Sequence, residues 1–126
     1  MVGVELQEEL YVTATKNRAL NGCSNVTFMR ADVRERFDLP DGRPFNVLVC
    51  NPPFRAKNTG RSNPNRSRLL ARSEAALDLS FLLDFASAAL SSKGRAYVIY
   101  PAQRLAQVIA QASLKNLELK RLRVVH

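Results

Sequence analysis

The residues whose types and spacing best suit a chemical role lie at the end of N-V-L-V-C-N-P-P-F, positions 46–54. Consecutive prolines fix the backbone angle φ and donate no backbone hydrogen bond. Asn51 and the carbonyl group of Pro52 are therefore expected to form a rigid pair of acceptors. A planar amine that donated one N–H to each would keep its lone pair localised and more nucleophilic, and Phe54 could stack on a planar base. The structural alternative is a stiff turn through Pro53 that ends a strand, with Phe54 in the core.

Two carboxylates stand upstream of this corner, each at the end of an expected strand. Glu5 ends the short segment V-G-V-E, and Asp32 ends V-T-F-M-R-A-D. A carboxylate at the carboxyl end of a parallel strand can accept hydrogen bonds from ribose hydroxyls. A second carboxylate, one strand later, could accept from the exocyclic amine of a purine. The alternative is that each carboxylate caps the helix that follows it.

Positive charge is concentrated directly after the corner. The formal net charge is +8, and residues 55–73 contain Gly60, Pro64 and no apolar period. Such a long irregular segment predicts a functional loop. Between Asn51 and Ser73 there is no acidic residue, and the basic ones are Arg55, Lys57, Arg61, Arg66, Arg68 and Arg72. The distribution predicts an anionic partner, nucleic acid first.

The elements that would position these residues alternate between strand and helix. Besides the first segment, strands are expected at 26–32, 45–50, 96–100 and about 117–125, and helices at about 7–20, 78–90 and over Leu105, Val108, Ile109 and Ala112. In the helix at 78–90, Ser80, Asp84 and Ser87 should form one polar stripe on an otherwise buried surface. The alternation predicts a doubly wound α/β fold with a mainly parallel sheet. The apolar strand 45–50 should be covered on both faces.

The composition argues against several kinds of site. Cys23 and Cys50 are too few for a disulfide scaffold, and no pattern suggests a metal site. The only histidine is His126, and no nucleophile triad is apparent. With neither an export signal nor an apolar run of about 20 residues, a cytoplasmic protein that contacts no membrane is expected.

Several segments together resemble a known family. N-P-P-F after an apolar strand resembles motif IV of class I S-adenosylmethionine-dependent amino methyltransferases, V-G-V-E-L their second-strand segment, and R-A-D-V their third-strand segment. N-P-P-F-R-A-K-N-T-G-R-S-N-P-N with L-L-A-R-S-E resembles, more narrowly, bacterial tRNA adenine-N6 methyltransferases of the small-methyltransferase-domain group. These modify the adenine beside the anticodon of a valine tRNA. Ser73 stands where such proteins often have His.

The resemblance implies a role for each candidate residue. Glu5 would bind the ribose of S-adenosylmethionine, Leu6 would pack on its adenine, and Asp32 and the Val33 backbone would contact the adenine amine and ring. The four residues of the corner, Asn51, Pro52, Pro53 and Phe54, would hold the target amine in line with the sulfonium methyl group. The implied reaction is methyl transfer to adenine N6 of tRNA, driven by positioning.

Part of the family pattern is missing. No G-x-G occurs in the chain, whose glycines are at 3, 22, 42, 60 and 94. We therefore expect residues 1–126 to form one partial methyltransferase domain, truncated at both ends, from the second strand to about the sixth. Alone, such a piece should bind S-adenosylmethionine weakly or not at all, and its open sheet edge invites a homodimer. The alternatives are a guanine-N2 methyltransferase of ribosomal RNA, a glutamine methyltransferase of release factors, and a non-catalytic RNA-binding module.

Overall fold

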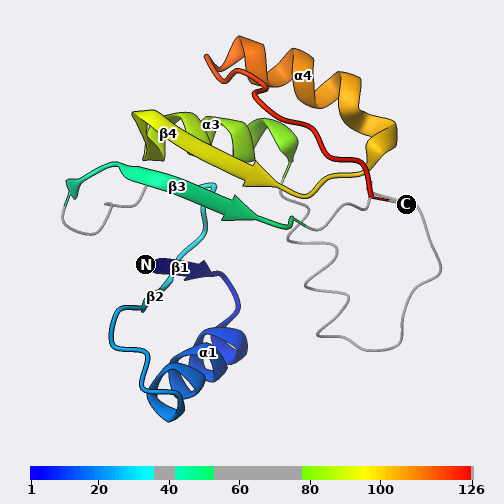
Figure 1. The fold of residues 1–126 in the computed structure, drawn as a ribbon. Helices are drawn as coiled ribbons and strands as arrows, with labels where there is room; N and C mark the ends of the chain where they lie inside the picture. The colour runs from blue at the N-terminus through cyan, green and yellow to red at the C-terminus, as the bar shows by residue number, and fades with distance from the viewer. Residues whose placement is uncertain (36–41, 53–77, 126) are drawn as a thin grey trace. The chain divides into compact units, whose positions relative to one another are not determined.

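The computed structural model describes residues 1–35, 42–52 and 78–125, which divide into two compact units, Met1–Arg43 and Pro44–His126 (Figure 1). Pro53, Phe54 and the basic loop at 55–73 lie outside the described residues. None of the described helices has the length and apolar character that a bilayer crossing needs.

The first unit is a parallel strand pair joined by one helix. Its elements are β1 (Val2–Glu5), α1 (Glu8–Leu20) and β2 (Thr27–Arg30). The register places Val2 opposite Thr27 and Glu5 opposite Arg30, so both strands end at the same edge. Two acidic residues in the first turn of α1 and a basic one in its last turn complement the helix dipole. After the helix, Gly22 adopts a φ of 62°, which glycine accommodates without steric cost.

The second unit pairs two further strands and carries two helices. Its elements are β3 (Phe45–Cys50), α3 (Leu79–Ala89), β4 (Leu90–Val98), the short 3-10 helix η2 (Ala102–Arg104) and α4 (Leu105–Leu114). β3 and β4 are parallel, with Cys50 opposite Val98. Leu79, Leu83 and Ala112 form the buried centre, against which Tyr100, Val108 and Leu117 pack.

The polar stripe expected on the helix at 78–90 is confirmed on α3, and it has a structural role. On α3, Asp84 and Ser87 are exposed and Ser80 is half-buried, whereas the leucines between them are buried. Asp84 forms an ion pair of 2.5 Å with Lys115, and the Ser87 hydroxyl donates to the Lys115 carbonyl oxygen at 2.9 Å. The stripe therefore attaches the end of α4 to α3.

Several sequence-based expectations about strands require correction. β4 spans 90–98 rather than 96–100, because its ladder with β3 already begins at Phe45 opposite Leu90 and continues past an irregularity. Within the described residues, β1 pairs with β2 and β3 pairs with β4, both in parallel, which establishes the mixed α/β class with parallel pairing. The last expected strand is wrong: residues 117–125 have no regular secondary structure.

The expectation that strand 45–50 is covered on both faces is also wrong. Val49 is 78% exposed and Val47 is 55% exposed, whereas Leu48 and Cys50 are half-buried. Side chains alternate between the two faces of a strand, so the described residues cover only one face of β3. Apolar residues on both faces allow burial but do not provide the covering layer.

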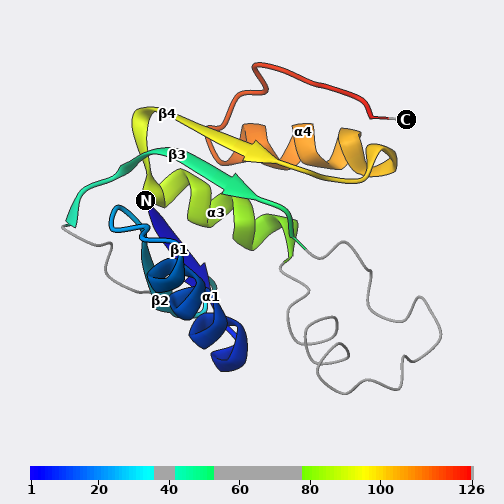
Figure 2. The ribbon, with the colours of Figure 1, turned by 60° about the horizontal axis from the view of Figure 1, so that its bottom comes forward.

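Residues 117–125 instead turn back beside the last helix. Asn116 adopts a φ of 57°, and the Leu117 N–H donates to the Ala112 carbonyl oxygen at 2.9 Å. In both Figure 1 and Figure 2 the segment then runs back along α4 and ends near the start of that helix.

Candidate functional site

Glu5 is positioned by the end of β1. The Ala31 N–H donates to the Glu5 carbonyl oxygen at 3.1 Å, which continues the ladder with β2. The Glu5 side chain is half-buried, and its Oε1 accepts from the Gln7 N–H at 2.8 Å, next to the first turn of α1. Oε1 is thus bound to the residue that precedes α1 and not to an N–H group of the helix itself. Oε2 has no hydrogen bond within the described residues, so it can accept one from a ligand hydroxyl.

Asp32 lies two residues beyond the end of β2, at the same edge as Glu5. Its Oδ1 accepts from the Arg34 backbone N–H at 2.9 Å, and its carbonyl oxygen accepts from the Glu35 N–H at 3.0 Å. This is a side-chain turn of the kind that Asp commonly makes with the backbone two residues on. It also places the half-buried Val33 within the turn.

The Arg34 side chain also donates hydrogen bonds to the Asp32 carboxylate. Its Nε donates to both Asp32 oxygens at 2.9 Å, and its Nη2 contacts Oδ2 at 2.5 Å. The side-chain hydrogen bonds of Arg34 lower the pKa of Asp32; desolvation opposes this, and the backbone hydrogen bond and charge of Arg34 add to it. Sequence reasoning missed Arg34. The sequence signal that could have found it is an Arg two residues after an Asp at a strand end, because a side-chain turn of this kind joins Asp to the residue two positions on.

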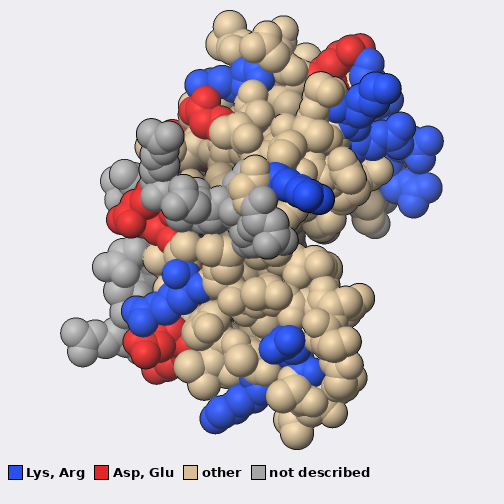
Figure 3. Space-filling view, turned by 90° about the vertical axis from the view of Figure 1, so that its left-hand side faces the viewer, with Lys and Arg blue, Asp and Glu red and all other residues tan. Residues whose placement is uncertain are grey.

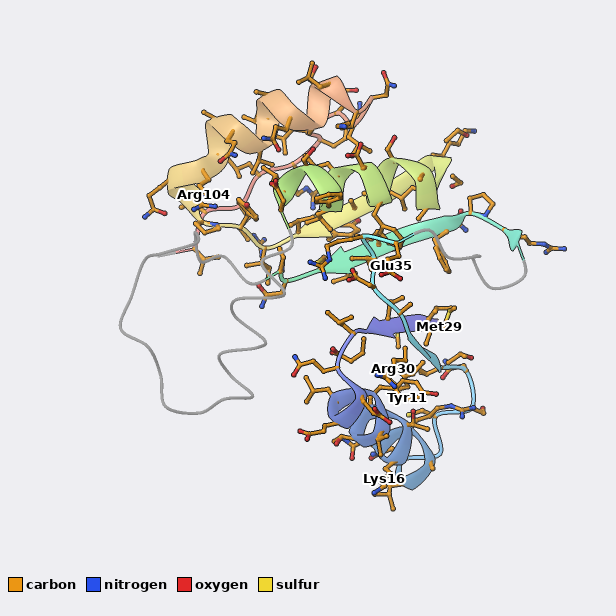
Figure 4. All side chains as sticks on the ribbon, turned by 180° about the vertical axis from the view of Figure 1, so that it is seen from behind. Tyr11, Lys16, Met29, Arg30, Glu35 and Arg104 are labelled. Carbon is orange, nitrogen blue, oxygen red and sulfur yellow. The ribbon has the colours of Figure 1, made fainter. Side chains whose placement is uncertain are left out.

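The remaining residues of the first unit complete this edge. Leu6, between β1 and α1, is 39% exposed and offers an apolar surface directly after Glu5 in the chain. Arg30, labelled in Figure 4, pairs with Glu8 of α1 at 3.1 Å. Because it is engaged with the helix, Arg30 leaves the strand-end carboxylates to Gln7 and Arg34.

Asn51 and Pro52 follow directly on β3 in the second unit. The Ile99 N–H donates to the Cys50 carbonyl oxygen at 3.1 Å, so the ladder with β4 holds the chain up to the residue before Asn51. Asn51 is exposed and Pro52 is buried. The proline thus anchors the corner while the amide side chain faces solvent, as an acceptor for an outside ligand must. Burial raises the pKa of the neighbouring Cys50 thiol, which favours its neutral form.

The structure thus brings Glu5, Leu6, Asp32 and Val33 to one sheet edge, and Asn51 and Pro52 to another. Pro53, Phe54 and the six basic residues of the loop fall outside the described ranges. Within 1–35, 42–52 and 78–125, no three His, Cys, Asp or Glu side chains form a group suited to a metal ion.

Comparison with known proteins gives two partial matches. No protein-family model matches the chain. The tRNA1(Val) (adenine(37)-N6)-methyltransferase of Flavobacterium psychrophilum is 33% identical over 99 residues, which are 78% of this chain and 41% of that enzyme. The enzyme of the same description from Porphyromonas gingivalis is 37% identical over 78 residues, 62% of this chain and 30% of that enzyme. The chain spans less than half the length of either relative. Over that length, it is a distant homologue of the tRNA1(Val) (adenine(37)-N6)-methyltransferases.

Proposed function

We propose that this chain carries the amine-binding corner and part of the cofactor edge of an S-adenosylmethionine-dependent N-methyltransferase, whose substrate is adenine N6 in tRNA. The observation that carries the proposal is the exposed Asn51 amide on a buried Pro52 at the carboxyl end of β3. This geometry occurs in a chain related to two tRNA adenine methyltransferases. Ligands of open parallel sheets bind at that end of the strands.

The corner would act by orienting the amine. The Asn51 side-chain oxygen accepts one N–H of the exocyclic amine and the Pro52 carbonyl oxygen accepts the other. Both hydrogen bonds keep the lone pair on nitrogen, available for attack on a methyl carbon. After transfer, the methylated nitrogen loses one proton to solvent. Because neither acceptor titrates near neutral pH, the rate depends on positioning rather than on a side-chain base.

The first unit fits part of the cofactor. S-adenosylmethionine, when bound, supplies the electrophilic methyl group. Glu5 fits its ribose, since Oε2 remains available to accept from a hydroxyl group, and Leu6 offers an apolar surface for its adenine. Asp32 and Val33 fit the adenine on one condition. A carboxylate can accept about four hydrogen bonds, and Arg34 donates four to Asp32. One of these hydrogen bonds must therefore break before the adenine amine can donate to Asp32.

The basic loop supplies the RNA side of the proposal. Its six cations, from Arg55 to Arg72, immediately follow the corner in sequence. Phosphate contacts provide much of the affinity of proteins for nucleic acids. We therefore assign this loop to the tRNA backbone near the target base, and the chain to the cytoplasm, where tRNA is modified.

A chimera tests the proposal although the chain covers only part of its relatives. The matching segment of the Flavobacterium psychrophilum enzyme is replaced by this chain, and the protein is incubated with S-adenosylmethionine and unmodified tRNA. Nucleoside mass spectrometry then identifies the methylated base and atom. We expect N6-methyladenosine, and a loss of about 10²-fold or more in rate for Asn51→Ala, similar to removal of one preorganised polar group in other active sites.

The control replaces another asparagine. Asn25 is exposed in the turn before β2, so Asn25→Ala should leave the rate unchanged. Full activity of the Asn51→Ala chimera would exclude the proposed role of the corner. N2-methylguanosine, or methylation of a release-factor glutamine but not of tRNA, would assign a different substrate.

A further inference from the structure

The second unit carries a basic surface outside the loop at 55–73. Its described residues include seven Lys or Arg against three Asp or Glu, whereas those of the first unit include five of each. The seven cations are Lys93, Arg95, Arg104, Lys115, Lys120, Arg121 and Arg123. Figure 3 shows Lys and Arg side chains gathered at one end of the displayed face, with few acidic ones beside them. The excess charge is therefore distributed unevenly.

The segment 117–125, L-E-L-K-R-L-R-V-V, contributes three of these cations within four residues. Lys120, Arg121 and Arg123 are all exposed. Lys120 pairs with Glu118, but their side chains are 73% and 76% exposed, and ion pairs in water are weak. No salt bridge to Arg121 or Arg123 occurs in the part of the chain that the structure describes. These charges are available to an outside partner.

The base of the segment is fixed to the second unit. Leu117 packs against the buried centre of Leu79, Leu83 and Ala112. The preceding Lys115 is held by both Asp84 and Ser87 of α3. The cations that follow therefore extend from a defined point.

The direction of the segment brings it toward the substrate corner. α4 begins seven residues after β4 ends, so its first turn lies on the side of the carboxyl ends of β3 and β4, where Asn51 follows β3. The segment runs back along α4 and ends near the start of that helix (Figures 1 and 2). Arg104, labelled in Figure 4, precedes the same helix start.

We propose that Lys120, Arg121 and Arg123 form a second RNA-contacting surface, which binds phosphates of the tRNA whose target base occupies the Asn51 corner. This inference rests on the proposed function and deepens it. The partner is a polyanion because the accessible groups are cations, of which Arg121 and Arg123 have no salt bridge within the described residues and Lys120 has only an exposed one. A membrane surface fits less well, since interfacial binding is typical of helices with a continuous apolar face, and this segment is not helical.

The test measures the salt dependence of tRNA binding by the 126-residue chain. Lys120→Gln, Arg121→Gln and Arg123→Gln are combined in one variant. The matched control combines Lys16→Gln, Arg30→Gln and Arg43→Gln, which remove the same charge from exposed positions of the first unit. Each phosphate contact contributes about 0.7–0.9 to the slope of log K against log salt. We expect the slope to decrease by about 2 in the first variant and by less than 1 in the control.

Three results would overturn the inference. They are equal slopes in the two variants, absence of tRNA binding by the unaltered chain, and stronger binding to phosphatidylserine vesicles than to tRNA. Circular dichroism establishes that both variants fold. The methyl-transfer assay of the chimera is read separately. If the chimera is active and the two variants have equal salt slopes, only the proposal of this RNA-contacting surface is refuted. If the chimera is inactive and the slope of the first variant is lowered, only the methyl-transfer proposal is refuted.

Discussion

The contact between Arg34 and Asp32 gives a prediction that links stability, titration and ligand binding. Arg34→Gln removes the charged side-chain donors and keeps the backbone N–H that donates to Oδ1. The pKa of Asp32 should therefore rise toward its ordinary value of 3.8, because the largest influence that lowers it is lost, while desolvation, which raises it, outweighs the backbone hydrogen bond that remains. A carboxyl-detected NMR titration of Asp32 measures this change directly.

The stability effect follows from exposure and geometry. The side chains of Arg34 and Asp32 are 38% and 13% exposed, so solvent screens the pair and we assign it the upper value for exposed pairs, about 1 kcal/mol. A carboxyl whose pKa is lowered by folding stabilises the folded state above its unfolded pKa, and this contribution is lost as the pH falls through the folded pKa. Urea unfolding should show the difference of about 1 kcal/mol at pH 7, decreasing below pH 3.8.

The matched control is Arg30→Gln. Arg30 and Glu8 are 53% and 67% exposed, so their pair should contribute less, and the variant should leave the pKa of Asp32 unchanged. An Arg34→Gln variant with an unaltered Asp32 titration would refute the reasoning. So would a stability difference of the same size at pH 3 and pH 7.

The same substitution tests whether Arg34 competes with a ligand. Because Arg34 uses the acceptor directions that an adenine amine needs, its removal should tighten binding of S-adenosylhomocysteine to the chimera. A difference of about 1 kcal/mol corresponds to about a fivefold decrease in Kd. Weaker binding in a titration calorimetry experiment would instead assign Arg34 itself to the ligand contact.

Two further predictions concern the second unit. Leu83→Ala should lower the free energy of unfolding by about 2–5 kcal/mol, because the truncated side chain leaves a cavity beside Leu79 and Ala112. As a control, Leu114→Ala, at a position 80% exposed, should change the free energy of unfolding little. Equal effects of the two substitutions in urea unfolding would argue against this core. Iodoacetamide should modify exposed Cys23 faster than Cys50, because burial raises the pKa of the Cys50 thiol and only the thiolate reacts. Mass spectrometry with time measures both rates, and faster modification of Cys50 would contradict its half-buried position.

Much of the local structure was predictable because its causes are local. The helices at 79–89 and 105–114 agree with the apolar patterns in the sequence, and the helix at 8–20 agrees with the range expected for it, since helical hydrogen bonds join residues four positions apart. β3 has the bounds 45–50 that its apolar run between polar residues predicts. The placement of Glu5 and Asp32 at one sheet edge also follows from sequence, because parallel strands share the direction of their carboxyl ends.

What the tertiary structure decided depends on partners distant in the chain. Residues 117–125 have the alternation of a strand, but a strand needs a neighbour to accept its backbone hydrogen bonds, and here the segment lies along α4 instead. The apolar pattern of β3 could not show that Val49 is exposed, because exposure depends on which layer covers the strand. Residue types predicted an available carboxylate at Asp32, whereas its availability depends on the conformation of Arg34. Sequence thus specified which groups can accept hydrogen bonds, and the packing of neighbouring elements determined which of them remain free.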